Sequence, residues 1–271
     1  MSIIAVSDVH LGMKGAKEQE FVNFIEEAKL KGVEHLVLLG DIIDIWRRDF
    51  IKAVLECSRS LTLLNDLADK MKVHYIVGNH DFYLLRLSEL LGKNFPFEVK
   101  KSTVIKSKNQ EFFFFHGYQL EVLCNPYYKS MKTYETFSEQ MCLAGDDTGN
   151  AADAAWKLFQ SSRSILDSLK RIPENPLDAL RSMMKPPEER IRNFNKHNVI
   201  EPIEELAGAE TRHFLFDIHP GQHLIYGHTH HQYLKKENKV ANTGSWGFGD
   251  DKKLEYIEIV NDEVMLKEFT G

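Results

Sequence analysis

The sequence predicts an α/β protein whose mostly parallel sheet is interrupted by a helical insertion. In the first third of the chain, short apolar runs alternate with helical patterns. After a long stretch without strand signals, such runs resume near residue 223. Strands that alternate with helices are typical of βαβ units, in which parallel strands are buried on both faces. The length of 271 residues suits one large domain or two small ones.

The first part of the expected core contains three strands separated by helices, followed by a hairpin. The three strands are expected at Ile3–Val6, His35–Leu39 and Val73–Val77. Between them, Glu18–Leu30 carries apolar residues at close to helical spacing, and Phe50–Met71 does so more loosely. Two further β-rich runs, Thr103–Lys106 and Phe112–Phe115, flank a polar turn and predict the hairpin.

Residues 118–216 are expected to form a helical insertion, or cap, between two parts of the core at 1–117 and 217–271. Strand signals disappear in this segment, and helical patterns are separated by Pro, Gly and Asn. The expected helices are Met131–Leu143, Ala151–Leu169, Leu177–Met184 and Pro187–Phe194. The strands expected after the insertion are His223–Tyr226, Tyr233–Lys236, Lys239–Ala241, Leu254–Ile259 and Glu263–Phe269.

Composition narrows the class of protein. A hydrophobic content of 43% and a charged content of 27% are ordinary for a globular protein. The net charge of −6 gives no bulk attraction to nucleic acid, although bound metal ions could supply positive charge locally. Three cysteines are too few for a disulfide scaffold and indicate a reducing compartment. The N-terminus lacks a basic region and no apolar run has the length of a membrane span, so we expect a cytoplasmic protein, with peripheral membrane contact left open.

Five of the expected strands end in residue types that bind metals. In chain order, these residues are Asp8 and His10, Asp41, Asn79, His116, and His228 with His230. In an open α/β sheet, ligands bind in the crevice beyond the carboxyl ends of the strands. Side chains that are far apart in the sequence are therefore expected to converge there.

The residue types indicate what this site binds. Imidazoles and carboxylates with one carboxamide and no thiolate suit divalent ions such as Mn²⁺, Fe²⁺ or Zn²⁺. They are too many for a single tetrahedral ion and about enough for two ions that share a carboxylate. Asp8 and His10 lie two positions apart, as do His228 and His230, so in extended chain each pair points to one face.

The motifs SDVHLG, GDIID, GNHD, the HG at His116 and GHTH, in this order, resemble the calcineurin-like metallophosphoesterase superfamily. The resemblance covers residues 1–117 and 222–246 and does not cover the insertion. It implies a four-layer αββα sandwich and a metal-dependent phosphoric ester hydrolase. It also implies two metal sites with Asp41 between them, one formed by Asp8, His10 and His230 and the other by Asn79, His116 and His228.

The resemblance also implies a mechanism. Two ions about 3.5–4 Å apart lower the pKa of a shared water and clamp the phosphoryl oxygens, so a metal-bridging hydroxide is expected to attack phosphorus. His80, held by Asp44, would stabilise the transition state or donate a proton to the leaving oxygen. Arg47 and Arg48 are expected to bind the substrate phosphate with forked donors, unless they form a solvated helix start.

Within the superfamily, the chain is most similar to UDP-2,3-diacylglucosamine pyrophosphohydrolases. The similarity lies in the early SDVHLG motif, the GDIIDIW stretch and the helical insertion between the HG and GHTH motifs. That family commonly carries Arg where this chain has His80. The implied substrate is a phosphodiester or pyrophosphate in a nucleotide- or lipid-linked molecule, and the implied cofactor is a pair of divalent ions, Mn²⁺ before Fe²⁺ or Zn²⁺.

Three alternatives remain open. A phosphomonoesterase of the protein phosphatase type would use the same metals, but its GDxVDRG signature is incomplete because Ile45 and Trp46 follow Asp44. A nuclease would need a basic track for the nucleic-acid backbone, and the chain shows no convincing run of Lys and Arg. A non-catalytic binding module would have lost metal ligands, and none of the seven is missing.

The remaining histidines are expected to have packing or surface roles. His35 and His74 lie near the starts of buried strands, and His231 is expected to point away from the metal site. Residues 242–245 form an NTGS turn that resembles a recurrent turn of the superfamily and is expected to support the metal-bearing loops.

Overall fold

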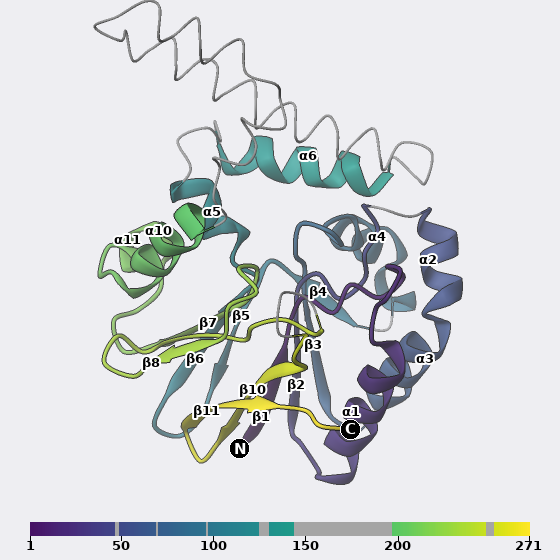
Figure 1. Cartoon of the computed structure of the whole chain (residues 1–271), viewed down its shortest axis with the longest axis horizontal. Coiled ribbons are helices and arrows are strands. Elements are labelled where there is room, and N and C mark those ends of the chain that lie inside the picture. The colour runs from purple at the N-terminus through teal and green to yellow at the C-terminus, as the bar shows by residue number, and fades with distance from the viewer. Residues whose placement is uncertain (47–48, 69, 96, 125–129, 144–196, 248–251) are drawn as a thin grey trace, which may run out of the picture.

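The computed structural model describes residues 1–46, 49–68, 70–95, 97–124, 130–143, 197–247 and 252–271. Two β-sheets lie at the centre, with helices on both sides (Figure 1). The first sheet has six strands in the order β11-β10-β1-β2-β3-β4, and the second has five in the order β5-β6-β7-β9-β8.

The first sheet contains the three strands expected at the start of the chain. The strands of this sheet are β1 Ser2–Val6, β2 His35–Leu39, β3 Lys72–Ile76, β4 Glu98–Lys100, β10 Glu255–Val260 and β11 Glu263–Glu268. Strands β1, β2, β3 and β4 are parallel to one another, while β10 is antiparallel to β1 and β11 is antiparallel to β10. The predicted βαβ units are therefore confirmed, and β4 adds a short strand that the sequence pattern did not indicate.

The second sheet begins with the predicted hairpin. Its strands are β5 Ser102–Lys106, β6 Glu111–Phe115, β7 His223–Tyr226, β8 Tyr233–Lys235 and β9 Val240–Asn242. Strands β5 and β6 are antiparallel, whereas β6, β7 and β9 are parallel to one another. The carboxyl ends of β6 and β7 therefore lie at the same edge.

The two sheets bury a common apolar layer. Alternate residues of β1 and β2 point into this layer, among them Ile3, Ala5 and Leu39. They pack against Phe112 and Phe114 of the second sheet. Because the strands of the first sheet are also covered by helices on their other face, they appear in the sequence as continuous apolar runs.

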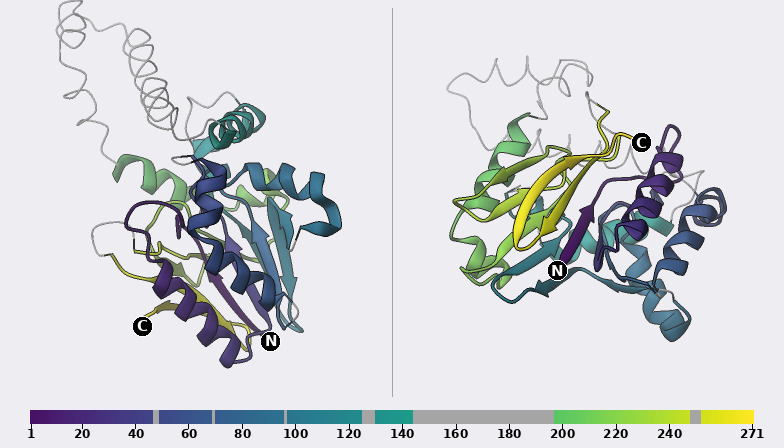
Figure 2. Two further views of the ribbon diagram at one scale, coloured as in Figure 1. Left: turned by 90° about the vertical axis from the view of Figure 1, so that its right-hand side faces the viewer. Right: turned by 90° about the horizontal axis from the view of Figure 1, so that it is seen from below.

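The outer faces of both sheets are covered by helices, so the four layers are α, β, β and α (Figure 2). The helices on the first sheet are α1 Glu18–Leu30, α2 Phe50–Glu56, α3 Ser58–Leu67 and α4 Tyr83–Leu91, followed by the 3-10 turn Gly92–Asn94. Helix α1 has the predicted bounds. The helical pattern over Phe50–Met71 is divided at Cys57, and the carboxylate of Asp49 caps α2 by accepting from Ile51 N at 2.9 Å.

Three helices that lie within or at the edge of the predicted insertion cover the second sheet. They are α5 Tyr118–Cys124, α10 His197–Gly208 and α11 Arg212–Phe216. Leu120, Ile203 and Ala207 pack there with Leu224 and Tyr226 of the second sheet. None of the three was expected as a separate helix from the sequence.

Helix α6, Met131–Leu143, has the predicted bounds and lies across one end of the two sheets (Figure 1). Tyr134 stacks on Tyr118 of α5 at 5.5 Å, and the Cys142 thiol donates to the His80 carbonyl at 3.4 Å. The expected helices Ala151–Leu169, Leu177–Met184 and Pro187–Phe194 lie outside the described residues, and the extent of the insertion stays a prediction. Within the part of the chain that is described, every helix is too short or too polar to cross a lipid bilayer.

Candidate metal centre

The predicted ligands follow strands whose carboxyl ends meet at one edge of the two sheets. The loops after β1 and β2 are joined by backbone hydrogen bonds from Asp8 N to Gly40 O at 3.0 Å and from His10 N to Asp41 O at 2.9 Å. The loops after β6 and β7 are joined in the same way, because Gly227 N donates to His116 O at 2.8 Å. Parallel pairing therefore brings the loops together.

The backbone at these loops is unusual. Ten described residues other than glycine have a positive φ angle, and five of them are predicted ligands, namely Asp8, His10, Asp41, His228 and His230. The left-handed conformation is unfavourable for residues with a Cβ atom and is concentrated at functional sites. The surrounding packing therefore holds these five side chains in directions that a relaxed strand end would not give them.

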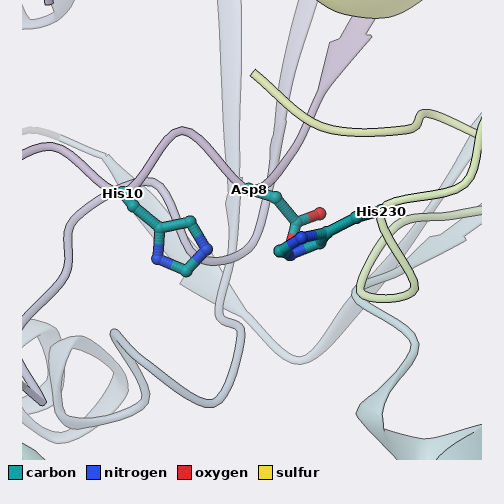
Figure 3. Close-up of side chains that lie close together, drawn as sticks. All are labelled: Asp8, His10 and His230. Atoms are coloured by element: carbon teal, nitrogen blue, oxygen red, sulfur yellow. The ribbon is translucent and has the colours of Figure 1, made fainter. Parts of the chain in front are cut away.

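Asp8, His10 and His230 form the first cluster, in which one potential ligand atom from each residue lies within 4.8 Å of the others. His230 Nε2 is 3.1 Å from Asp8 Oδ1. The Asp8 carboxylate meets the His230 ring, and the His10 ring approaches from the other side (Figure 3). Asp8 and His10 are buried, whereas the His230 side chain is 36% exposed, so this cluster opens to solvent at His230.

Asp41, His116 and His228 form the second cluster, again within 4.8 Å. His116 Nε2 is 3.3 Å from Asp41 Oδ2 and 3.2 Å from His228 Nδ1. The other nitrogen of His116 donates to the Leu39 carbonyl at 2.8 Å, and the other nitrogen of His228 donates to Glu121 Oε2 at 2.6 Å. Each ring is therefore fixed by a hydrogen bond on the side away from the cluster, and its other nitrogen faces the cluster.

Asp41 also belongs to a third group with His10 and His80, so the clusters are continuous. Asp41 Oδ1 accepts from the His80 backbone N–H at 2.8 Å, while Oδ2 faces His116. Gly78 lies directly against this carboxylate, and a Cβ atom at that position would overlap Asp41. Asp41 thus occupies the middle of the site.

Asp44 holds the two histidines of the third group. One of its oxygens accepts from His80 Nδ1 and the other accepts from His10 Nδ1, both at 3.2 Å. The expected contact between Asp44 and His80 is present in the structure, and its catalytic role stays a prediction. That Asp44 also holds a predicted metal ligand could not be foreseen from the motif.

The GNHD loop is fixed by Asp81, which is fully buried. Its carboxylate accepts from Gly78 N at 2.7 Å, from Ile42 N at 2.9 Å and from the Tyr75 hydroxyl at 2.8 Å. Burial, together with the negative charge of Asp41, raises the pKa of Asp81 to about 6. Asp81 therefore ties the loop after β3 to the loop after β2.

The electrostatics of the site favour positive charge. Burial alone would raise the carboxyl pKa values of Asp8, Asp41 and Asp44, but the neighbouring histidines outweigh burial and lower all three. Burial would likewise lower the pKa of His116, but Asp41 and Asp8 raise it to about 10. Buried carboxylates that stay ionised require a compensating cation.

Asn79 provides an independent indication that the residues fit metal ions. Its side chain is buried, and its Oδ1 has no hydrogen-bond partner among the described residues. A buried acceptor without a donor is costly unless an ion or water satisfies it. Imidazoles, carboxylates and this carboxamide together form a donor set suited to Mn²⁺, Fe²⁺ or Zn²⁺.

The NTGS turn supports the loops that carry the predicted ligands, as expected. Asn242 Nδ2 donates to Gly227 O at 2.8 Å and to Thr229 Oγ1 at 3.0 Å, which fixes the GHTH loop. Thr243 Oγ1 lies 2.7 Å from Ser7 Oγ, and Ser7 in turn hydrogen-bonds the Asp8 carboxylate. The turn thereby joins the first and last motifs of the site.

Some predicted residues are not placed, and others were missed. Arg47 and Arg48 lie outside the described residues. Glu121 and Trp46 were not singled out as site residues, although Trp46 belongs to the GDIIDIW stretch. Glu121 carries no motif signal, because it meets His228 only through the folding of α5.

Two sheets packed face to face, with side chains of metal-ligand types at their strand ends, are typical of a metallophosphoesterase fold. A family model described as calcineurin-like phosphoesterase matches residues 1–232, and the chain belongs to this family of phosphoric ester hydrolases. The predicted superfamily, fold and enzyme class are therefore confirmed.

Two curated proteins and one solved structure are similar to this chain. A UDP-2,3-diacylglucosamine hydrolase from Shewanella sp. strain W3-18-1 is 26% identical over 91% of this chain and 89% of its own. One from Shewanella sp. strain ANA-3 is 22% identical over 91% of this chain and 90% of its own. Among solved structures, a dimetal phosphatase from Danio rerio aligns over 99% of this chain and 95% of its own, with 13% identity and a TM-score of 0.48.

Proposed function

We propose that this enzyme hydrolyses a phosphodiester or pyrophosphate bond at a centre of two divalent metal ions. The position of Asp41 carries this proposal. Its carboxylate belongs both to the group with His10 and to the group with His116 and His228. A carboxylate shared by two adjacent sets of ligands is what a pair of ions requires of its bridging residue.

The remaining ligands are divided between the two ions. Asp8, His10 and His230 would hold one ion, because they already form a compact cluster. His116 and His228 would hold the other together with Asn79, whose buried Oδ1 has no partner among the described residues. We propose Mn²⁺ as the ion, and Fe²⁺ or Zn²⁺ would suit the same donors.

Divalent ions in such a pair lower the pKa of a coordinated water and stabilise charge on the phosphoryl oxygens. The protein itself contributes His80. The carboxylate of Asp44 accepts from His80 Nδ1 and favours the protonated ring, since a negative charge at hydrogen-bond distance stabilises an imidazolium. As the bond from phosphorus to the leaving oxygen breaks, this imidazolium would donate its proton to that oxygen.

We propose a nucleotide-linked, acylated sugar as the substrate class. Relatives named as UDP-2,3-diacylglucosamine hydrolases align with about nine-tenths of this chain, and the GDIIDIW stretch supports the same class. A nucleoside diphosphate sugar contains a pyrophosphate bond, which matches the proposed reaction. Arg47 and Arg48 would bind the substrate phosphates.

Hydrolysis of model esters tests the proposal. The metal-stripped enzyme is supplied with Mn²⁺, Fe²⁺ or Zn²⁺ and assayed with bis-p-nitrophenyl phosphate, p-nitrophenyl phosphate and UDP-2,3-diacylglucosamine. We expect the diester and the pyrophosphate to be cleaved faster than the monoester. Faster cleavage of the monoester would favour a phosphomonoesterase, and no hydrolysis with any of these ions would contradict the proposed function.

A further inference from the structure

We propose that Glu121 is a positioning residue that orients His228 for binding one of the two metal ions, an inference that rests on the proposed dinuclear centre. Glu121 lies on α5, outside every motif that marks the family. Its carboxylate contacts the ring nitrogen of His228 that faces away from the cluster.

The two ring nitrogens of His228 have different partners. Nε2 is 2.6 Å from Glu121 Oε2, and Nδ1 is 3.2 Å from His116 Nε2. An ionised carboxylate can only accept, so the proton of a neutral His228 ring lies on Nε2. The lone pair is then on Nδ1, which points into the cluster.

His116 is arranged in the same way by a different partner. Its Nδ1 donates to the Leu39 carbonyl at 2.8 Å, which leaves the lone pair of the neutral ring on Nε2. Two imidazole lone pairs and Asp41 Oδ2 therefore converge, with Asp41 Oδ2 3.3 Å from His116 Nε2. Without a metal ion, a proton between His116 Nε2 and Asp41 Oδ2 keeps these groups paired, and a metal ion that displaces this proton meets three good ligands. Acceptors behind metal-binding histidines fix the ring tautomer and raise ligand basicity.

The fold explains why Glu121 reaches His228. Strands β6 and β7 are parallel neighbours, so His116 and His228 emerge side by side at their ends. Helix α5 starts at Tyr118, directly after the HG motif, and Glu121 lies in its first turn. The side chains of His228 and Glu121 are only 13% and 15% exposed, and limited exposure to water strengthens their interaction.

A second histidine–carboxylate pair in the same part of the molecule provides a matched control. His231 Nδ1 is 2.6 Å from Glu204 Oε1, and the Glu204 side chain is also 15% exposed. His231 belongs to no cluster of potential ligands among the described residues, and its own side chain is 60% exposed. Removing Glu204 therefore breaks an equally short pair near the site without touching a proposed ligand.

Mn²⁺ titration of Glu121→Ala, Glu121→Gln and Glu204→Ala tests this role, with electron paramagnetic resonance to count bound ions and with kcat and KM measured alongside. We expect Glu121→Ala to weaken one of two Mn²⁺ sites by about 10- to 100-fold and to leave the other unchanged. Glu121→Gln should weaken it less, because the amide oxygen still accepts from Nε2. Glu204→Ala should bind both ions as the wild type does, and excess Mn²⁺ should restore most of the kcat of Glu121→Ala.

Other results would overturn the inference. If Glu121→Ala binds both ions with wild-type affinity, or if Glu204→Ala weakens the same site equally, Glu121 does not position His228. Thermal unfolding of the metal-free variants separates this role from a purely structural one, which would lower Tm without changing Mn²⁺ affinity. A wild-type enzyme that binds fewer than two Mn²⁺ ions would instead contradict the dinuclear centre itself.

Discussion

The indole of Trp46 stacks on the imidazole of His80, with ring centroids 4.4 Å apart and ring planes inclined by 20°. Both side chains are buried. On another side, Trp46 meets Phe137 of α6 at 6.0 Å in an edge-on arrangement. The stack restricts the orientation of the His80 ring. Trp46 therefore lies between helix α6 and the proposed catalytic histidine and contacts both.

Loss of this stack should lower turnover without removing metal. We expect Trp46→Leu to reduce kcat by about 10- to 100-fold, since a small misplacement of a catalytic group costs this much. Mn²⁺ affinity should be unchanged, because none of the three potential metal clusters includes Trp46. Steady-state kinetics on bis-p-nitrophenyl phosphate and a Mn²⁺ titration provide the measurement. Wild-type kcat in Trp46→Leu would show that the stack does not orient His80.

His80→Gln should separate catalysis from metal binding. Because general acid catalysis typically contributes 10²–10⁴-fold, we expect kcat to fall by about that factor while both ions stay bound. His231→Gln is the control, as His231 pairs with Glu204 instead of Asp44. Metal content measured by atomic absorption should match the wild type in both variants. A His80→Gln enzyme with wild-type rates on several esters would exclude the proposed role.

Asp44→Asn should weaken both catalysis and metal binding, in contrast to His80→Gln. Its two oxygens hold His80 and His10, so the neutral amide disturbs the proposed acid and a proposed metal ligand together. We expect a loss of kcat similar to that of His80→Gln, plus about 10-fold weaker Mn²⁺ binding. Paired titrations of the two variants measure the difference. Equal Mn²⁺ affinity in both would mean that Asp44 supports His80 alone.

The elements that the sequence predicted well are those with strong periodicity. Glu18–Leu30 and Met131–Leu143 were predicted with their observed bounds, as was the strand His35–Leu39, which is buried on both faces. The short strand Glu98–Lys100 was missed because two of its three side chains are exposed and charged. Helix α5 was missed because it spans only seven residues, too few for a helical period to stand out.

The candidate site divides in a similar way. Its predicted ligands could be found from short stretches of sequence, because each of them follows a strand within a few residues. The contacts that organise them are not local. Asp44 meets His10, and Glu121 meets His228, across 34 and 107 positions of the chain. Such pairs depend on strand order and helix direction, which a single sequence does not specify.

Metal removal should lower both activity and stability. We expect the EDTA-treated enzyme to be inactive and Mn²⁺ to restore it. An ion that binds only the folded state stabilises it by about 2.7 kcal/mol at a concentration 100 times its Kd. Differential scanning fluorimetry with increasing Mn²⁺ should therefore show a rising Tm. Asp41→Asn should abolish most of this rise, because the proposed bridging charge is lost, and an unchanged rise would contradict the position assigned to Asp41.

A pair of histidines remote from the metal centre should make the fold sensitive to acid. His35 Nδ1, at the start of β2, and His74 Nε2, in the middle of β3, are 3.0 Å apart. Burial, reinforced by the nearby His35, lowers the pKa of His74 to about 4, and burial together with Lys72 also lowers the pKa of His35. Below a pH of about 6.5, the unfolded chain then binds protons that the folded chain does not.

The stability that depends on the neutral forms of His35 and His74 is therefore fully present above pH 6.5, and it is lost as the pH falls towards 4. We expect His74→Leu to flatten the decline in the free energy of unfolding between pH 6.5 and 5, as measured by urea titration at several pH values. His219→Leu, at an exposed position, should leave the decline unchanged. The difference between the wild-type and His74→Leu curves cancels the effects of the carboxylates and the metal site, which both proteins share. Parallel curves over this range would show that the histidine pair does not set the acid sensitivity.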